Sequence, residues 1–335
     1  KMSIPAQDQQ YENFIIRFKQ NIEGVPEYQP DERFQIINDL FGVLYVPIQE
    51  IPELALNSYS YSSIPRCYTY MDTGALSASG VTRLHGHPYL KLKGSGTLVA
   101  IIDSGIDYLH PAFHRGMTSK ILSIWDQELD GGMTEKIPFG REFTRVEIEQ
   151  ALSAENPWEV VPSMDKSGHG TGVAATAAGY SIEKEGFSGA APEAELVIVK
   201  LKQAKQYLRD FYLLPQDADI YQEDDIMLAI AYVLRVAAEN QKPLSICIGL
   251  GSSMGAHQGE GPLNEYINSI AAFSQNAVSV SAGNEGTARH HYMKTLTAVN
   301  MRDTIELRVG EKESIRGFML EFWGDSPNFY SMTIQ

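Results

Sequence analysis

The sequence predicts an α/β protein built on a parallel sheet with helices on both faces. Short apolar segments alternate with longer helical patterns through the middle of the chain, as expected for parallel strands joined by crossover helices. A smaller α+β pattern precedes this region, and an apolar–polar alternation of period two follows it. We therefore expect three units, residues 1–75, 76–298 and 299–335.

The charge of the chain argues against two classes of partner. Asp and Glu number 42 against 27 Lys and Arg, which gives the 335 residues a formal net charge of -15. Such a surface repels phosphate backbones and anionic lipids, so we expect neither nucleic acid nor a membrane as a partner. The sequence has no apolar run of about 18 residues that would span a bilayer, and residues 1–10 lack the apolar core of a signal peptide.

Residues 1–75 predict a small α+β unit. We expect strands over 11–20 and 43–46, and short helices over 31–39 and 50–56. A unit of about 70 residues is marginally stable by itself, so it should dock on the larger neighbour. The segment 66–93 contains Gly, Ser, Thr and Pro in loose order, which suits an exposed link between units, and we place a cleavage site there.

The central unit carries the alternating pattern. We expect strands over 98–102, 195–201, 244–248 and 277–280, and helices over 170–178, 222–239 and 263–275. The longest of these helices begins with Glu223, Asp224 and Asp225, which suit its positive N-terminal end. We expect these acidic side chains to be solvated and the helix to serve only as scaffold.

From Val299 the pattern changes to period two. Three segments, 305–309, 318–323 and 329–334, predict short strands separated by polar turns. We expect them to be the start of an antiparallel β domain that residues 299–335 do not complete.

In the central unit, a carboxylate lies at the end of a predicted strand and an imidazole lies at the start of a predicted helix. Asp103 ends the first apolar strand, and the carboxyl ends of parallel strands converge on one edge of a sheet, where ligands bind. An Asp before Ser-Gly is also common as a turn former. His169 lies in Gly-His-Gly-Thr-Gly, which enters a helix. Glycine costs about 1 kcal/mol relative to alanine in a helix interior, so this run of glycines indicates a close backbone approach. The field of the helix disfavours a charged imidazole there unless a carboxylate is near, and Asp103 is the candidate.

An amide follows the last strand of this unit at Asn284, in Ala-Gly-Asn-Glu-Gly. Its side chain is expected at the same edge of the sheet as Asp103, where an amide N–H is suited to donate to an oxyanion. Asn beside glycine is also a common left-handed turn residue, and this alternative stays open.

Taken in order, the segments 98–105, 167–179 and 278–286 resemble the signatures of the subtilase family of serine proteases. The resemblance implies a subtilisin-like fold, with Asp103 as the catalytic aspartate, His169 as the catalytic histidine and Asn284 in the oxyanion hole. In that mechanism the histidine takes the proton of a nucleophilic serine, the aspartate orients the ring, and the asparagine binds the tetrahedral oxyanion.

The motif of the nucleophile is missing, because no Gly-Thr-Ser occurs in the 335 residues. Our first hypothesis is a serine endopeptidase whose serine comes from the C-terminal remainder of the same polypeptide or from a second chain. The alternative is a catalytically inactive pseudoprotease that keeps the fold for binding and regulation. Residues 251–255 fit the Gly-x-Ser-x-Gly elbow of other hydrolases, but there the Asp and His follow the serine, so Ser253 is expected to be a loop residue.

The segment 246–251 resembles the substrate-binding strand of the family, which assigns substrate contacts to Gly249, Leu250 and Gly251. An extended peptide adds to such a strand through backbone hydrogen bonds. The substrate is therefore expected to be a protein or peptide.

Further segments, 121–126, 154–158 and 285–292, resemble the clostridial Csp germination proteases. The resemblance implies a retained prodomain over 1–75, with residues 68–76 in the cleft as a product-like strand. It also implies an inserted jelly-roll domain that begins at 299, a role in spore germination, and a spore-associated or extracellular location.

We expect neither a metal nor a cofactor. Many subtilases have a calcium-ligating Asp after His-Pro, but here Ala112 follows His110-Pro111 and offers no hard oxygen ligand. Four other histidines have no cysteine or acidic ligand at a recurrent spacing and are expected to be solvated: His85, His87, His290 and His291. We expect Cys67 and Cys247 to be buried free thiols, and we expect three tryptophans to be packing anchors: Trp125, Trp158 and Trp323.

Overall fold

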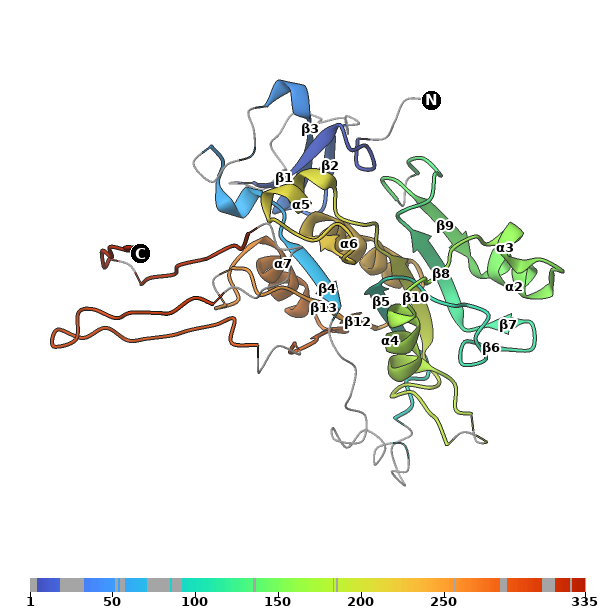
Figure 1. Cartoon of the computed structure of the whole chain (residues 1–335). Helices are drawn as coiled ribbons and strands as arrows, with labels where there is room; N and C mark the ends of the chain where they lie inside the picture. Colours follow the sequence, from blue (N-terminus) through green and yellow to red (C-terminus); the bar gives the residue numbers. More distant parts are fainter. Residues whose placement is uncertain are drawn as a thin grey trace.

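The computed structural model describes residues 5–18, 33–51, 54, 58–70, 85, 92–134, 137–182, 184, 186–255, 257–283, 288–308, 317–325 and 327–334. Figure 1 shows a central sheet packed with helices, a small N-terminal sheet above it, and C-terminal segments that project to one side. The protein is α/β with a mostly parallel sheet, so the predicted fold class is confirmed.

Six strands form the central sheet, in the order β14-β12-β5-β10-β8-β9. They are β5 (Leu98–Asp103), β8 (Ile121–Asp126), β9 (Arg141–Thr144), β10 (Glu195–Lys200), β12 (Leu244–Ile248) and β14 (Asn276–Val280). All neighbouring pairs are parallel except β8 and β9. The four strands predicted for this region are therefore present, and β5 lies inside the sheet with all its residues buried.

Helices cover both faces of β5. Side chains of a strand alternate between faces, so Leu98, Ala100 and Ile102 pack in one cluster with α6 (Glu223–Glu239) and α7 (Pro262–Ala271). Val99 and Ile101 lie in a second cluster with α4 (His169–Ala178) and α2 (Arg145–Ser153). The three predicted helices are present as α4, α6 and α7.

The central unit also contains shorter elements. They are α3 (Pro157–Val160), α5 (Gln206–Phe211), and the hairpin of β6 (His114–Arg115) and β7 (Thr118–Ser119). Within the described ranges, no helix is both long and apolar enough to cross a bilayer.

The N-terminal unit contains an antiparallel sheet in the order β1-β3-β2. Its strands are β1 (Tyr11–Arg17), β2 (Phe34–Ile36) and β3 (Phe41–Pro47), followed by the 3-10 helices η2 (Ile48–Glu50) and η3 (Tyr61–Ser63). The two strands predicted in this unit are confirmed as β1 and β3.

The helix predicted over 31–39 is wrong for its described part, 33–39, where β2 forms instead. The reason is a tight turn, because Asn38 Oδ1 accepts hydrogen bonds from the backbone N–H groups of Leu40 (2.9 Å) and Phe41 (2.8 Å). This turn folds β2 back onto β3. The helix predicted over 50–56 falls mostly outside the described residues, and only Glu50 lies in η2.

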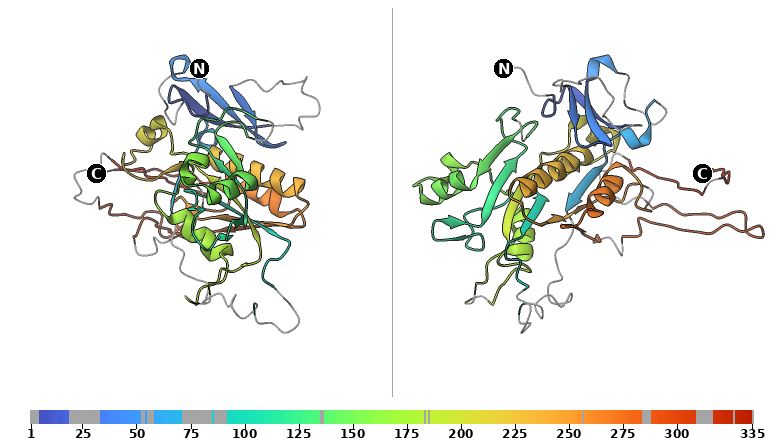
Figure 2. Two further views of the ribbon diagram at one scale, coloured as in Figure 1. Left: turned by 90° about the vertical axis from the view of Figure 1, so that its right-hand side faces the viewer. Right: turned by 180° about the vertical axis from the view of Figure 1, so that it is seen from behind.

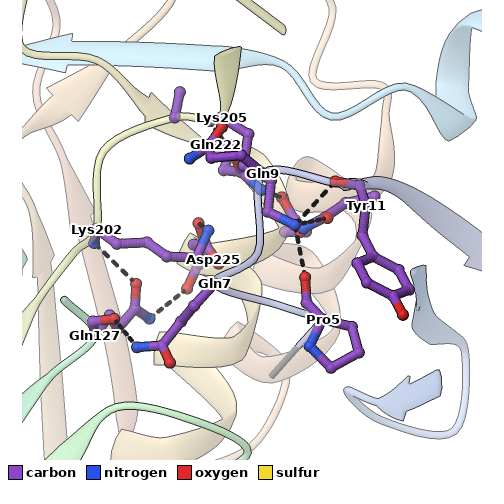
Figure 3. Close-up of polar contacts among 12 residues, drawn as sticks. Pro5, Gln7, Gln9, Tyr11, Gln127, Lys202, Lys205, Gln222 and Asp225 are labelled. Atoms are coloured by element: carbon purple, nitrogen blue, oxygen red, sulfur yellow. Dashed lines mark hydrogen bonds and ion pairs between the residues drawn. The ribbon is translucent and has the colours of Figure 1, made fainter. Parts of the chain in front are cut away.

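Buried polar contacts join the N-terminal unit to the central unit (Figure 3). Lys205 is 1% exposed, and its Nζ donates to the carbonyl oxygens of Pro5 (2.8 Å) and Tyr11 (3.1 Å) and to Asn13 Oδ1 (2.8 Å). All three acceptors belong to the first residues of the chain. Burial, assisted by repulsion from the charge of Lys202, lowers the pKa of Lys205 to about 7.

The acidic start of α6 differs from its prediction, because Glu223, Asp224 and Asp225 are at most 1% exposed and are not solvated. Asn13 Nδ2 donates to Asp224 Oδ2 (2.6 Å), and Lys202 forms an ion pair with Asp225. Burial raises the pKa of Asp225, and the charge of Lys202 opposes this effect. The N-terminal unit covers this end of α6, so the helix also has a docking role.

No strand is present in the described residues after Val299, so the three strands predicted there are not formed. Val299 is 92% exposed and Phe329 is 100% exposed. Figure 2 shows these segments as extended chain that runs away from the central unit. A strand needs a paired backbone neighbour, which the described segments lack, although Met319 packs against a cluster that includes Ile64 and Leu208. The jelly-roll domain stays a prediction, and the anchor role of Trp323, which is 52% exposed, is not observed.

Candidate active site

Asp103 and His169 meet at the carboxyl edge of the central sheet. Asp103 is the last residue of β5, and His169 is the first residue of α4. His169 Nδ1 lies 2.7 Å from Asp103 Oδ1, with the two side chains 17% and 0% exposed. The N–H of Ser104 also donates to Asp103 Oδ1 (2.7 Å), which fixes the orientation of the carboxylate. The structure thus brings together the two residues that the sequence singled out.

Glycines allow the backbone to approach this pair. A Cβ on Gly170 would lie 2.3 Å from the carbonyl oxygen of Gly105, so α4 begins in direct contact with the loop after β5. A Cβ on Gly249 would lie 2.7 Å from Asp103 Oδ2 and 3.2 Å from His169 Cε1. The close approach predicted from the glycines is therefore present at Gly170. It is absent at Gly172, where an added Cβ meets open space.

The predicted substrate-binding residues already have a strand beside them. Gly249 follows β12, and β13 (Leu250–Gly251) pairs antiparallel with β4 (Cys67–Tyr70). The other side of β4 pairs with β11 (Tyr221–Gln222), which places β4 in the middle of a three-stranded sheet. The segment that leaves the N-terminal unit therefore occupies the strand position next to Leu250 and Gly251.

Several other predicted residues lie elsewhere. Asn284, His87 and residues 71–76 are outside the described residues. His85 is half-buried, and its Nε2 lies 2.7 Å from the carbonyl oxygen of Ala190, so it is not a solvated histidine.

The remaining histidines and the serine of the elbow-like motif lie on exposed chain. His290, His291 and Ser253 are exposed, and the ring of His291 stacks on that of His257 at 5.2 Å. In the part of the chain that the structure describes, no three His, Cys, Asp or Glu side chains are grouped to hold a metal ion.

Sequence reasoning missed Asp165, which lies in the loop before α4. Its carboxylate accepts hydrogen bonds from both sides of the Asp103–His169 pair. Burial raises the pKa of Asp165, but hydrogen bonds from Thr171, Ser104 and Gly168 outweigh burial, so the pKa lies below its usual value. The signal in the sequence was an Asp shortly before a helix start, a position that commonly satisfies the free N–H groups of the first turn.

Comparisons with known proteins give a family and a similar solved structure. The model of the subtilase family matches residues 94–305. The solved structure titled "Structure of the Clostridium Perfringens CspB protease" is similar to this chain, with 27% sequence identity and a TM-score of 0.52. That match covers 63% of this chain and 40% of the CspB chain, so this chain spans well under half of that protein. No curated protein matches the chain.

Proposed function

The chain belongs to the subtilase family, and from this premise we propose that it forms the Asp–His part of a serine endopeptidase active site. One observation carries the proposal, the distance of 2.7 Å between Asp103 Oδ1 and His169 Nδ1 at the carboxyl edge of the sheet. The carboxylate holds the Nδ1–H tautomer, which leaves Nε2 free of a proton and able to act as a base. His169 then takes the proton of a serine hydroxyl and later gives it to the leaving amine.

The proposed nucleophile lies outside the 335 residues, in the C-terminal remainder of the polypeptide or in a second chain. The outer strand of the central sheet supports this proposal. β14 lies at one end of the strand order, and its residues Ala277, Ser279 and Val280 are exposed. β14 lies next to β12, which leads into Gly249 beside the catalytic pair. Polypeptide that covers this edge would be within reach of His169. Asn284 follows the same strand and is our proposed oxyanion donor.

The proposed role of the N-terminal unit is that of a prodomain. β4 extends from this unit into the strand position beside Leu250 and Gly251, where an extended substrate is expected to bind. We therefore propose that β4 and the residues after it are a product-like strand left by cleavage within 68–76. N-terminal sequencing of the purified protein should find an N-terminus in that range, whereas a single species without one would contradict autoprocessing.

The absence of a Gly-Thr-Ser motif favours one second candidate, a pseudoprotease that retains the fold for binding and regulation. Under either function the proposed partner is a protein. We further propose that this partner is connected with spore germination, on the resemblance of residues 121–126, 154–158 and 285–292 to the clostridial Csp germination proteases.

A fluorophosphonate probe separates the two functions, because it reacts only with an activated serine. The full native protein should form an adduct on one serine. A His169→Ala variant should lose the adduct, since the base is removed, while His257→Ala, a matched change at an exposed histidine, should keep it. A folded native protein that forms no adduct would disprove the endopeptidase and leave the pseudoprotease.

A further inference from the structure

A single carboxylate organises the loop that precedes α4. Asp165 is half-buried, and both of its oxygens are used. It accepts five hydrogen bonds: Oδ1 from Ser104 Oγ (2.8 Å), Ser167 Oγ (3.1 Å) and Gly168 N–H (3.0 Å), and Oδ2 from Thr171 N–H (2.9 Å) and Thr171 Oγ1 (2.7 Å).

Ser104 connects this carboxylate to the Asp103 side of the site. Its hydroxyl donates to Asp165 and accepts a hydrogen bond from Gly170 N–H (2.9 Å). Its backbone N–H donates to Asp103 Oδ1, the same oxygen that faces His169 Nδ1. A shift of Ser104 therefore changes the orientation of the Asp103 carboxylate.

Thr171 connects the same carboxylate to the His169 side. It lies in the first turn of α4, two residues after His169, and donates to Asp165 through both its N–H and its hydroxyl. The Thr171 hydroxyl also accepts from the N–H of Asp107, in the loop after β5. Asp165 thus bridges the strand end that carries one member of the pair and the helix start that carries the other.

We propose that Asp165 is a positioning residue that fixes the start of α4 against the loop after β5, so that His169 Nδ1 stays within hydrogen-bonding distance of Asp103. Its hydrogen bonds reach the pair through Ser104, through Thr171, and through Ser167, whose Oγ accepts from the N–H of His169 (3.1 Å). The geometric part of the proposal stands by itself, whereas the consequence for catalysis rests on the proposed function. A carboxylate suits this position because every group that faces it is a donor.

The test measures the imidazole itself, so it needs no nucleophile. Exchange of the His169 ring proton with water is measured by NMR in ¹⁵N-histidine-labelled wild-type protein and in the Asp165→Asn and Ser104→Ala variants. The Nδ1–H signal of His169 is assigned by its loss in the His169→Ala variant. Asp165→Asn places a donating NH₂ against donors, so the ring proton should exchange with water about tenfold faster, the factor expected for one net hydrogen bond. Ser104→Ala should produce a change in the same direction. Asp210→Asn, the same substitution at an exposed residue of α5, should leave the signal unchanged.

A different result is expected if Asp165 only caps the start of α4 and does not position His169. In that case Asp165→Asn raises the exchange of the Thr171 amide while the ring signal of His169 stays as in the wild type, and this outcome would overturn the proposal. If Asp165→Asn does not fold, Ser104→Ala decides, because an unchanged ring signal in that variant also overturns it. In a form of the protein with its nucleophile, kcat should fall about tenfold or more with KM unchanged, since misplacement affects the reaction and not binding.

Discussion

Gly170→Ala gives a direct measure of how tightly α4 is pressed against the loop after β5. The new Cβ would lie 2.3 Å from the carbonyl oxygen of Gly105 and 3.0 Å from its nitrogen. Both atoms belong to backbone, which cannot rotate away as a flexible side chain does. The start of α4 must therefore move.

The size of the movement follows from the contact distance. An ordinary contact begins at 3.4 Å, so the helix start must retreat by 3.4 minus 2.3, or 1.1 Å. If His169 moves with it directly away from Asp103, the 2.7 Å separation grows to 3.8 Å, and the hydrogen bond is lost. Overpacking costs about 2 kcal/mol and the lost hydrogen bond about 1.5 kcal/mol, while alanine restores about 1 kcal/mol of helix propensity. The expected net loss is about 2 to 3 kcal/mol.

Chemical denaturation of both variants on α4 measures this difference. Gly172→Ala is the matched control, because its Cβ meets open space, and it should raise the free energy of unfolding by about 1 kcal/mol. The same substitution two residues apart thus has opposite signs. Two outcomes would contradict a tight contact at Gly170. One is a Gly170→Ala variant as stable as the wild type with the ring signal of His169 intact, and the other is a Gly172→Ala variant destabilised by as much as Gly170→Ala.

Three further variants test other parts of the structure. Burial lowers the pKa of Lys120 from 10.5 to about 8, so between these pH values the unfolded chain holds more protons and stability rises with pH. Lys120→Met should remove up to about 3 kcal/mol of that rise. The urea midpoint should then depend less on pH between 8 and 10.5 than in the wild type, and parallel curves for the two proteins would contradict this. Lys205→Met leaves three acceptors of the N-terminal unit without their donor, so the free energy of unfolding should fall by about 1–3 kcal/mol. Proteolysis of the N-terminal unit should also become faster. Unchanged proteolysis would show that Lys205 does not hold this unit in place. Thr144→Ala removes the capping box of α2 and should cost about 1 kcal/mol in the same denaturation assay, with no change counting against the cap.

The sequence predicted the elements that depend on local pattern. β5 and α4 follow from an apolar run and from small helix-forming residues, so their positions agree with the structure to within a residue. The proximity of Asp103 and His169 also followed, because strand ends converge in a parallel sheet.

The predictions that are wrong concern features that depend on contacts between distant segments or on single side chains. Asp224 and Asp225 resemble a solvated helix start in the sequence, but both are buried in contacts with distant residues, Asp224 with Asn13 and Asp225 with Lys202. The sequence pattern predicts a helix where β2 forms, because the turn at Asn38 depends on a side-chain hydrogen bond that periodicity does not report. The strands predicted after Val299 need partners that the described chain does not supply.

Under the proposed function, Asp103 and His169 form a catalytic pair that activates a serine from outside these 335 residues. The most direct measurement is a crystal structure of the full native protein after reaction with a fluorophosphonate. We expect the modified serine oxygen to lie within about 3.2 Å of His169 Nε2, with Nδ1 still bound to Asp103. A modified serine remote from His169, or a ring turned away from Asp103, would contradict it.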